Sequence, residues 1–228
     1  MIDSSIFSLE NRVAIVTGGG SGIGRGIALA FAPSSLLLGV TTQLTTDVAS
    51  VPLLWVVPLA LYLITFVIVF SRRRLIPHAW IIRVQPIVLV IAIVSTNLTD
   101  SILILCATHL TIFFIVSLVC HGELVRLRPP AGGLTEFYLA MGIGGALGGF
   151  FNAIVAPVLF VGVYEYGLAI VVACLLRPHA ATHRSLQHFL DVALPAGLLA
   201  IIVLTMVSDF GLRYADDGIF SAGILTVL

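Results

Sequence analysis

Long uncharged apolar stretches alternate with short polar turns along almost the whole chain. A helix that crosses the hydrocarbon core of a bilayer needs about 20 predominantly apolar residues. Six stretches of 16–28 residues approach or exceed that length, a seventh, 166–176, is short unless 161–165 enters the membrane with it, and another apolar run begins close to Leu228. The pattern therefore predicts an all-α polytopic membrane protein with about seven transmembrane helices and a truncated eighth. The expected spans are 26–46, 51–70, 84–99, 101–120, 137–164, 166–176 and 192–208, and 218–228 begins the eighth.

The composition points to the same environment. Hydrophobic residues make up 59% of the chain and charged residues only 10%, whereas an average soluble domain is about 25% charged. Burial does not explain the deficit, because a chain of this size still exposes much of its surface. The expected partner is therefore the lipid bilayer. The formal net charge is zero, so no electrostatic attraction to nucleic acid is expected.

The basic residues give the chain an orientation. All of them are arginine, because the sequence contains no lysine. If span 26–46 crosses outward and the later spans alternate, ten of the eleven arginines fall on one side and only Arg213 falls on the other. Basic residues gather on the cytoplasmic side of membrane proteins, so the N-terminus is expected in the cytoplasm. The ten are Arg12, Arg25, Arg72, Arg73, Arg74, Arg83, Arg126, Arg128, Arg177 and Arg184.

A glycine-rich turn near the N-terminus indicates a different chemistry. A short β-branched stretch at 13–16 leads into TGGGSGIG at 17–24. Glycines there would let the backbone approach a pyrophosphate, and a helix from Gly24 would offer its N-terminus to the negative charge. This segment, about 9–31, resembles the opening of a short-chain dehydrogenase/reductase. The resemblance implies an NAD(P) site at Thr17, Gly18, Gly22, Ile23 and Gly24.

The rest of the chain lacks what that family's chemistry requires. The resemblance implies a Tyr-x-x-x-Lys pair and an Asn-Asn-Ala-Gly motif, and a chain without lysine has no such pair. We therefore predict no catalytic residue, and no cofactor unless NAD(P) binds at the turn. The domain division expected from this is a cytoplasmic leader, 1–25, followed by a helical membrane domain, 26–228.

The longer part of the chain resembles a second family. PSSLLLGVTTQLTTD from Pro33, CHGELVRLRP from Cys120 and LTEFYLAMGIGGALGGFFNAIVAPVLF from Leu134 are similar to the membrane region of bacterial fused major-facilitator-like/spermidine-synthase-like proteins. The resemblance covers 32–228. It implies a transporter-like helical bundle in the bacterial inner membrane, followed in the family by a soluble aminopropyltransferase-like domain.

Together the two resemblances describe a chimera that is truncated before the synthase-like domain. Three functions follow as hypotheses. The chain is a transporter-like membrane region without catalytic activity, an NAD(P)-dependent oxidoreductase of the short-chain type, or a membrane anchor or scaffold module.

Polar side chains within apolar stretches are costly in a membrane and are therefore candidate functional residues. Asp47 follows several threonines where the first two spans meet, and Asn152 lies deep in the fifth span. Asp47, Asn152 and Glu136 would line a cavity for a small polar or cationic solute in a transporter-like bundle. Alternatively, Asp47 caps the next helix, and Asn152 forms a hydrogen bond to a neighbouring helix.

A second group of polar residues lies near the expected cytoplasmic ends of the fourth and fifth spans. His121, Glu123 and Glu136 would form a charge cluster with Arg126 and Arg128, or would serve as interface anchors and helix caps. The cysteines and histidines show no spacing suited to zinc, so no metal site is predicted.

The fifth span also contains a run of small residues. Gly144 and Gly148 form one GxxxG pair, and Gly145 and Gly149 form an overlapping one. Such pairs let two helix backbones approach closely. They predict helix–helix association, within one molecule or between molecules.

Overall fold

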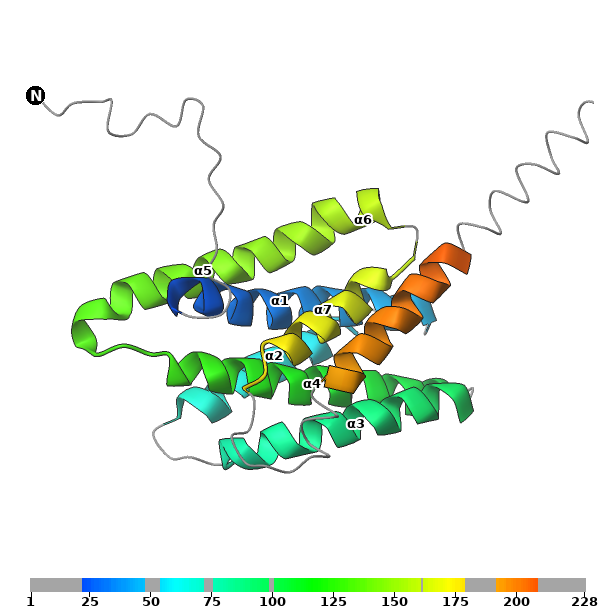
Figure 1. Ribbon diagram of the computed structural model, residues 1–228, viewed down its shortest axis with the longest axis horizontal. Helices are drawn as coiled ribbons and strands as arrows, with labels where there is room; N and C mark the ends of the chain where they lie inside the picture. Colours follow the sequence, from blue (N-terminus) through cyan, green and yellow to red (C-terminus); the bar gives the residue numbers. More distant parts are fainter. Residues whose placement is uncertain are drawn as a thin grey trace, which may run out of the picture.

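The computed structural model describes residues 22–47, 54–71, 76–98, 101–160, 162–178 and 192–208. The secondary structure of these residues is helical, with no strand among them, and the helices form one bundle (Figure 1). The elements are α1 (Gly22–Asp47), α2 (Val56–Phe70), α3 (His78–Leu98), α4 (Ile102–Arg126), the 3₁₀ turn η2 (Ala131–Gly133), α5 (Leu134–Phe150), the π-helical turn η3 (Phe151–Val155), α6 (Ala156–Leu159), α7 (Tyr164–Leu175) and the helix Val192–Ser208.

Four of these helices are long and apolar enough to cross a membrane. They are Gly22–Thr45, His78–Ser95, Ile102–Arg126 and Ala131–Leu159. The apolar helices Val56–Phe70, Tyr164–Leu175 and Val192–Ser208 are shorter. The predicted all-helical architecture is confirmed, and four of the seven expected spans meet the length criterion. The expected eighth, 218–228, lies outside the described residues.

The predicted fifth span, 137–164, is wrong at its C-terminal end. The helical run ends at Leu159, Phe160 is extended, and Tyr164 already belongs to α7. Pro157 explains the irregularity before this end, because proline has no amide hydrogen to continue the helical ladder. The π-helical turn Phe151–Val155 directly precedes Ala156 and Pro157. Hydropathy alone does not reveal this break, since the whole stretch is uncharged.

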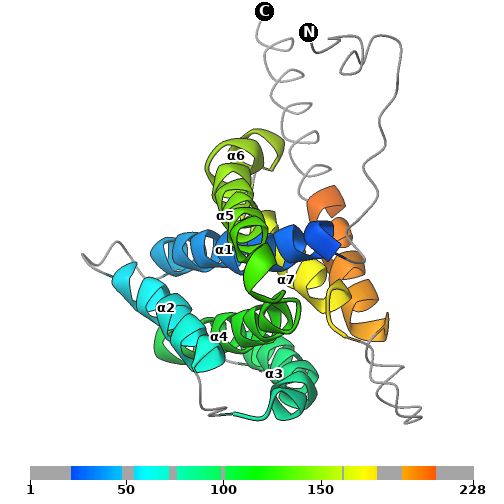
Figure 2. The same ribbon diagram turned by 90° about the vertical axis from the view of Figure 1, so that its left-hand side faces the viewer.

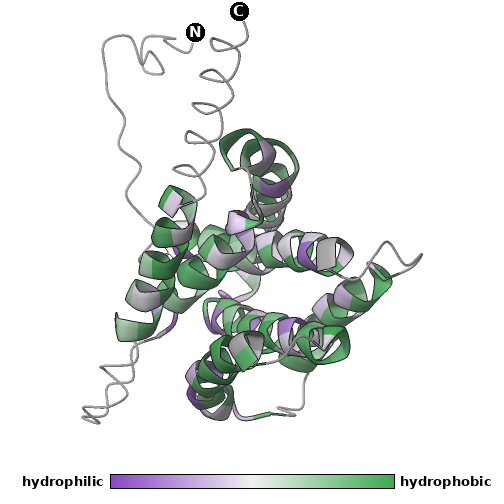
Figure 3. Ribbon diagram, turned by 90° about the vertical axis from the view of Figure 1, so that its right-hand side faces the viewer, coloured by the Kyte–Doolittle hydropathy of each residue, from purple (hydrophilic) through white to green (hydrophobic). Residues whose placement is uncertain are grey.

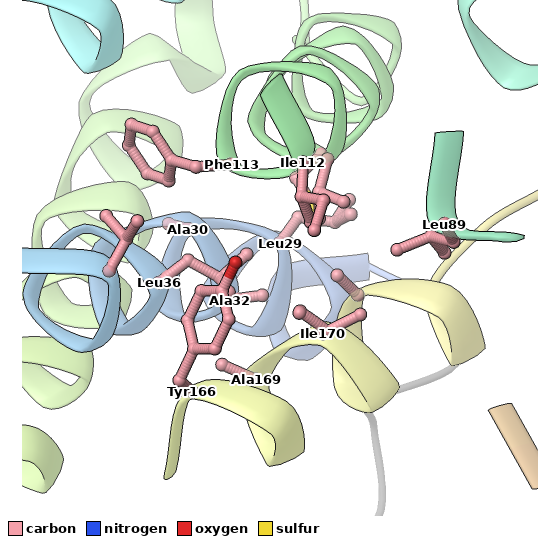
Figure 4. Packing of buried hydrophobic residues seen from close by; sticks show 14 of the residues in the cluster. Leu29, Ala30, Ala32, Leu36, Leu89, Ile112, Phe113, Tyr166, Ala169 and Ile170 are labelled. Atoms are coloured by element: carbon pink, nitrogen blue, oxygen red, sulfur yellow. The ribbon is translucent and has the colours of Figure 1, made fainter. Parts of the chain in front are cut away.

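Helix α1 is the central element of the bundle. It packs against α4, α5 and α7, and half of its span is buried, against 22–33% in the other three candidate spans. Figure 4 shows Leu29 and Leu36 of α1 beside Phe113 of α4 and Tyr166 of α7. The burial explains why α1 tolerates Ser35, which is fully enclosed by protein.

The glycine-rich turn ends inside this central helix. Helix α1 begins at Gly22, whose φ is +61°, and continues without a break to Asp47. The expected helix start, Gly24, is thus two residues late. The predicted boundary between 1–25 and 26–228 falls within the first turns of α1.

Consecutive spans run in opposite directions, with α5, η3 and α6 forming one continuous span (Figures 1 and 2). The starts of α1 and α3 and the ends of α4 and α7 therefore meet at one end of the bundle, which we call the basic end because Arg25, Arg126 and Arg177 lie there. Away from the ends, apolar residues predominate on every helix (Figure 3).

Candidate functional site: a buried ion-pair cluster

A buried carboxylate lies at the basic end. Glu123 is in the last turn of α4, and its side chain is only 7% exposed. Its Oε1 is 2.5 Å from His78 Nε2 and 3.0 Å from Arg126 Nη1, and its Oε2 is 3.6 Å from Arg25 Nη2. Breaking a buried ion pair leaves a charge without compensation, which is costly. These contacts from α1, α3 and α4 therefore compensate the burial of Glu123. We call these four residues the ion-pair cluster.

A glycine makes the contact between α3 and α4 possible. The His78 ring lies directly over Gly122, where a Cβ atom would overlap the imidazole. His78 is the first residue of α3, immediately after Pro77. Because residue 122 has no side chain, the ring can reach the carboxylate one residue further along α4.

Arg25 connects α1 to the cluster, in addition to α3 and α4. Besides its ion pair with Glu123, its Nη2 donates a hydrogen bond to the Leu176 carbonyl, at 3.3 Å, just beyond the end of α7. Carbonyl groups at the C-terminal end of a helix have no intrahelical donor, so the Leu176 carbonyl needs a partner from elsewhere. One side chain from the first turn of α1 thus connects α1 with both α4 and α7.

His121 faces a different neighbour, α2. Its ring is fully buried, 3.9 Å from the Phe66 ring and edge-on to Tyr62 at 5.2 Å. The Thr65 hydroxyl donates to the Tyr62 carbonyl at 2.6 Å, so it accepts from His121 Nδ1–H at 2.8 Å. Nε2 has no hydrogen-bond partner among the described residues.

The sequence-predicted charge cluster is thus only partly assembled. Glu123 and Arg126 are brought together, but His121 lies on the α2 side of α4. Glu136 is exposed in the first turn of α5, and Arg128 is exposed after the end of α4.

Asn152 and the glycines form the contact between α1 and α5. Asn152 Nδ2 donates to Ser35 Oγ at 2.5 Å. A Cβ atom at Gly144 or Gly148 would overlap backbone atoms of α1, whereas Gly145 and Gly149 have no described atom within 4 Å of such a Cβ. The pair Gly144/Gly148 therefore packs within the molecule. Asn152, Ser35, Gly144 and Gly148 are called the glycine interface below.

The polar group around Asp47 belongs to the end of α1. The hydroxyls of Thr41, Thr42 and Thr45 donate to carbonyls of their own helix. Helix α2 begins at Val56 with Trp55 in the capping position. The Asp47 side chain lies outside what the structure describes.

Two residues of the ion-pair cluster, His78 and Arg25, were not identified as site residues from the sequence. The signal that would have found them is topological. If spans alternate, the starts of the first and third helices meet the end of the fourth, and the polar residues there become neighbours.

The predicted nucleotide site is only partly described. Thr17 and Gly18 lie outside the described residues, and Gly22, Ile23 and Gly24 form the first turn of α1. In the described part of the chain, no three His, Cys, Asp or Glu residues are grouped as a metal site would require.

Comparison with known proteins found no family model, no curated protein and no solved structure that matches the chain. The two family resemblances therefore stay predictions from the sequence.

Proposed function

We propose that the chain is a seven-span helical module of the bacterial inner membrane that acts as an anchor or scaffold, with its N-terminus in the cytoplasm. The apolar outer surface carries this proposal. Val67, Leu103 and Val158 on three different helices are 69%, 81% and 82% exposed. Soluble monomers rarely expose apolar patches larger than a few hundred Å², and lipid removes the penalty that water would impose on such a surface.

The shorter apolar helices complete the proposed span count. A 15-residue helix such as α2 rises about 22 Å, somewhat less than the hydrocarbon thickness. Local thinning of the bilayer compensates such a mismatch at modest cost. Successive spans, whether short or long, run in opposite directions (Figure 1). Each shorter helix therefore fits one crossing of the membrane.

The basic end supports the proposed orientation. Arg25, Arg126 and Arg177 lie there, and arginine accumulates on the cytoplasmic side of membrane proteins. This end then faces the cytoplasm, together with the N-terminus of α1.

The contacts of the polar residues favour a scaffold over a solute pathway. Asn152 forms a helix–helix hydrogen bond, and Glu136 is exposed at a helix start. These two residues lie sixteen positions apart on one helical run, so roughly 24 Å of helix separates them. The resemblance to the fused family agrees with an anchoring role, because the membrane part there carries a soluble domain.

A transporter-like role for a small polar or cationic solute is the second candidate. One observation favours it: Glu123 is a buried carboxylate within a helical bundle, and such residues mark many transport pathways. Solute uptake into proteoliposomes that Glu123→Gln abolishes would establish this role.

The packing of α1 argues against the oxidoreductase alternative. In a dinucleotide-binding fold the helix after the glycine-rich turn packs against a parallel sheet. Here α4, α5 and α7 contact α1. Titration with NADPH, followed by cofactor fluorescence, tests the alternative directly, and saturable binding would support it.

Cysteine labelling tests the membrane proposal. The three native cysteines are replaced by serine, and one cysteine is introduced at either end, by Arg128→Cys or Leu98→Cys. We expect the protein to resist alkaline extraction from membranes. An impermeant thiol reagent should label Leu98→Cys from the periplasm and Arg128→Cys only after the inner membrane is opened. Recovery in the soluble fraction would refute the proposal, and the reverse labelling would refute the orientation.

A further inference from the structure

A cavity opens beside the ion-pair cluster. It has a volume of about 670 Å³ and lies between the end of α2, the start of α3 and the end of α4. Its walls are mostly apolar, with Ile68, Val69, Ile81 and Ile82 among the lining residues. His78 and Arg126 supply the ionisable side chains of the lining, and no described lining residue is acidic.

The local charge favours an anion. The carboxylate of Glu123 is 7% exposed and already contacted by three side chains, so it offers little to an incoming cation. The Arg126 side chain is 62% exposed and uses Nη1 for Glu123. A guanidinium carries five N–H donors, which leaves donors on Arg126 for a ligand in the cavity.

The helix termini around the cavity add to this preference. Pro77, His78 and Ala79 line it at the start of α3, whose first turn contains no acidic residue. A helix N-terminus carries partial positive charge. The last turn of α4 has the opposite polarity, but Arg126 lies in that turn, and the Leu127 amide donates to the Glu123 carbonyl at 3.2 Å.

From the charge and the apolar walls we infer that this cavity binds the phosphate headgroup of an anionic phospholipid of the cytoplasmic leaflet. Arg126 would contact the phosphate, while His78 stays paired with Glu123, and the isoleucines would contact the first part of an acyl chain. The inference rests on the proposed membrane location and orientation. Basic pockets between transmembrane helices on the cytoplasmic side are suited to acidic lipid headgroups.

The two tryptophans of the chain provide a natural reporter. Trp80 follows the cavity residue Ala79 in α3 and is 63% exposed, whereas Trp55 is 54% exposed at the start of α2, at the opposite end of the bundle. In Trp55→Phe the tryptophan fluorescence comes from Trp80 at the cavity end only. In Trp80→Phe it comes from Trp55 at the opposite end only.

The test reconstitutes both single-tryptophan proteins in nanodiscs that contain a minor fraction of brominated lipid. We expect brominated phosphatidylglycerol to quench Trp80 more strongly than brominated phosphatidylcholine does, with no such preference at Trp55. In the Trp55→Phe background, Arg126→Gln should reduce the preference about ten-fold, as expected when one hydrogen bond between charged groups is lost. The matched control, Arg128→Gln, removes an exposed arginine of the same end that does not line the cavity.

The outcomes separate the two proposals. Equal quenching of Trp80 by both lipids, or equal loss of preference in the two arginine variants, overturns the headgroup site while membrane embedding stands. No quenching of either tryptophan by any lipid overturns the membrane proposal itself. Loss of the preference on addition of millimolar inorganic phosphate, at unchanged ionic strength, would assign the site to free phosphate and overturn the lipid assignment.

Discussion

The glycine interface and the ion-pair cluster attach the same helix, α1, by opposite means. At the glycine interface, Gly144 and Gly148 have no side chain and α5 lies against the α1 backbone. At the ion-pair cluster, long side chains from α1, α3 and α4 converge on one buried carboxylate. Lipid does not drive apolar helices together, so packing and polar contacts must do so. Shape determines the first contact, and charge compensation determines the second.

The largest effect is expected from removing the shared carboxylate. Glu123→Ala removes the carboxylate that Arg25, His78 and Arg126 share, and the Arg25 guanidinium then loses its counter-charge. Breaking a buried pair costs about 3 kcal/mol at the low end of the known range, and the low end applies because Arg126 is largely exposed. Unfolding in mixed micelles measures this change. Glu136→Ala, an exposed acid in α5, is the control and should change stability by less than about 0.5 kcal/mol.

A smaller effect is expected from adding volume at the glycine interface. Gly148→Val places atoms where the Phe31 carbonyl and the Ser35 amide of α1 already lie. Overpacking of this kind costs about 1–3 kcal/mol, measured in the same unfolding assay. Gly149→Val is the matched control, because position 149 has open space around it. Equal destabilisation by the two variants would mean that α5 does not present the Gly144/Gly148 face to α1.

The smallest effect is expected from the interhelical hydrogen bond. Asn152→Ala removes the donor to Ser35, and a double-mutant cycle with Ser35→Ala isolates the pair. Such bonds in membrane proteins contribute about 0.6 kcal/mol on average. A coupling energy of zero would show that the side chains do not interact in the folded protein.

The contrast between the glycine interface and the ion-pair cluster also explains which features the sequence predicts well. Apolar stretches predict most helices closely, and the described residues 192–208 of the last expected full span are helical. The helix break after Leu159 was missed because every residue of that stretch is uncharged. Asn152 was recognised as a helix-contact candidate because it is isolated among apolar residues.

The ion-pair cluster was harder to predict. Glu123 and Arg126 are neighbours on one helix, so their pairing follows from a spacing of three residues. His78 and Arg25 reach Glu123 only because three helix ends converge, and Gly122 matters only because His78 lies over it. Residues far apart in sequence become one site through packing, which no local pattern encodes.

The central claim is that α1, whose first turn contains the end of the glycine-rich stretch 17–24, is the core helix of a membrane bundle. Disulfide cross-linking in native membranes tests it most directly. Ser35→Cys and Asn152→Cys are introduced together in the cysteine-free protein, since those two side chains touch and cysteine pairs require such proximity. Ser35→Cys with Ala153→Cys is the control, because Ala153 is exposed. We predict an intramolecular cross-link for the first pair only. No cross-link, or one that forms only between two copies, would contradict the central place of α1.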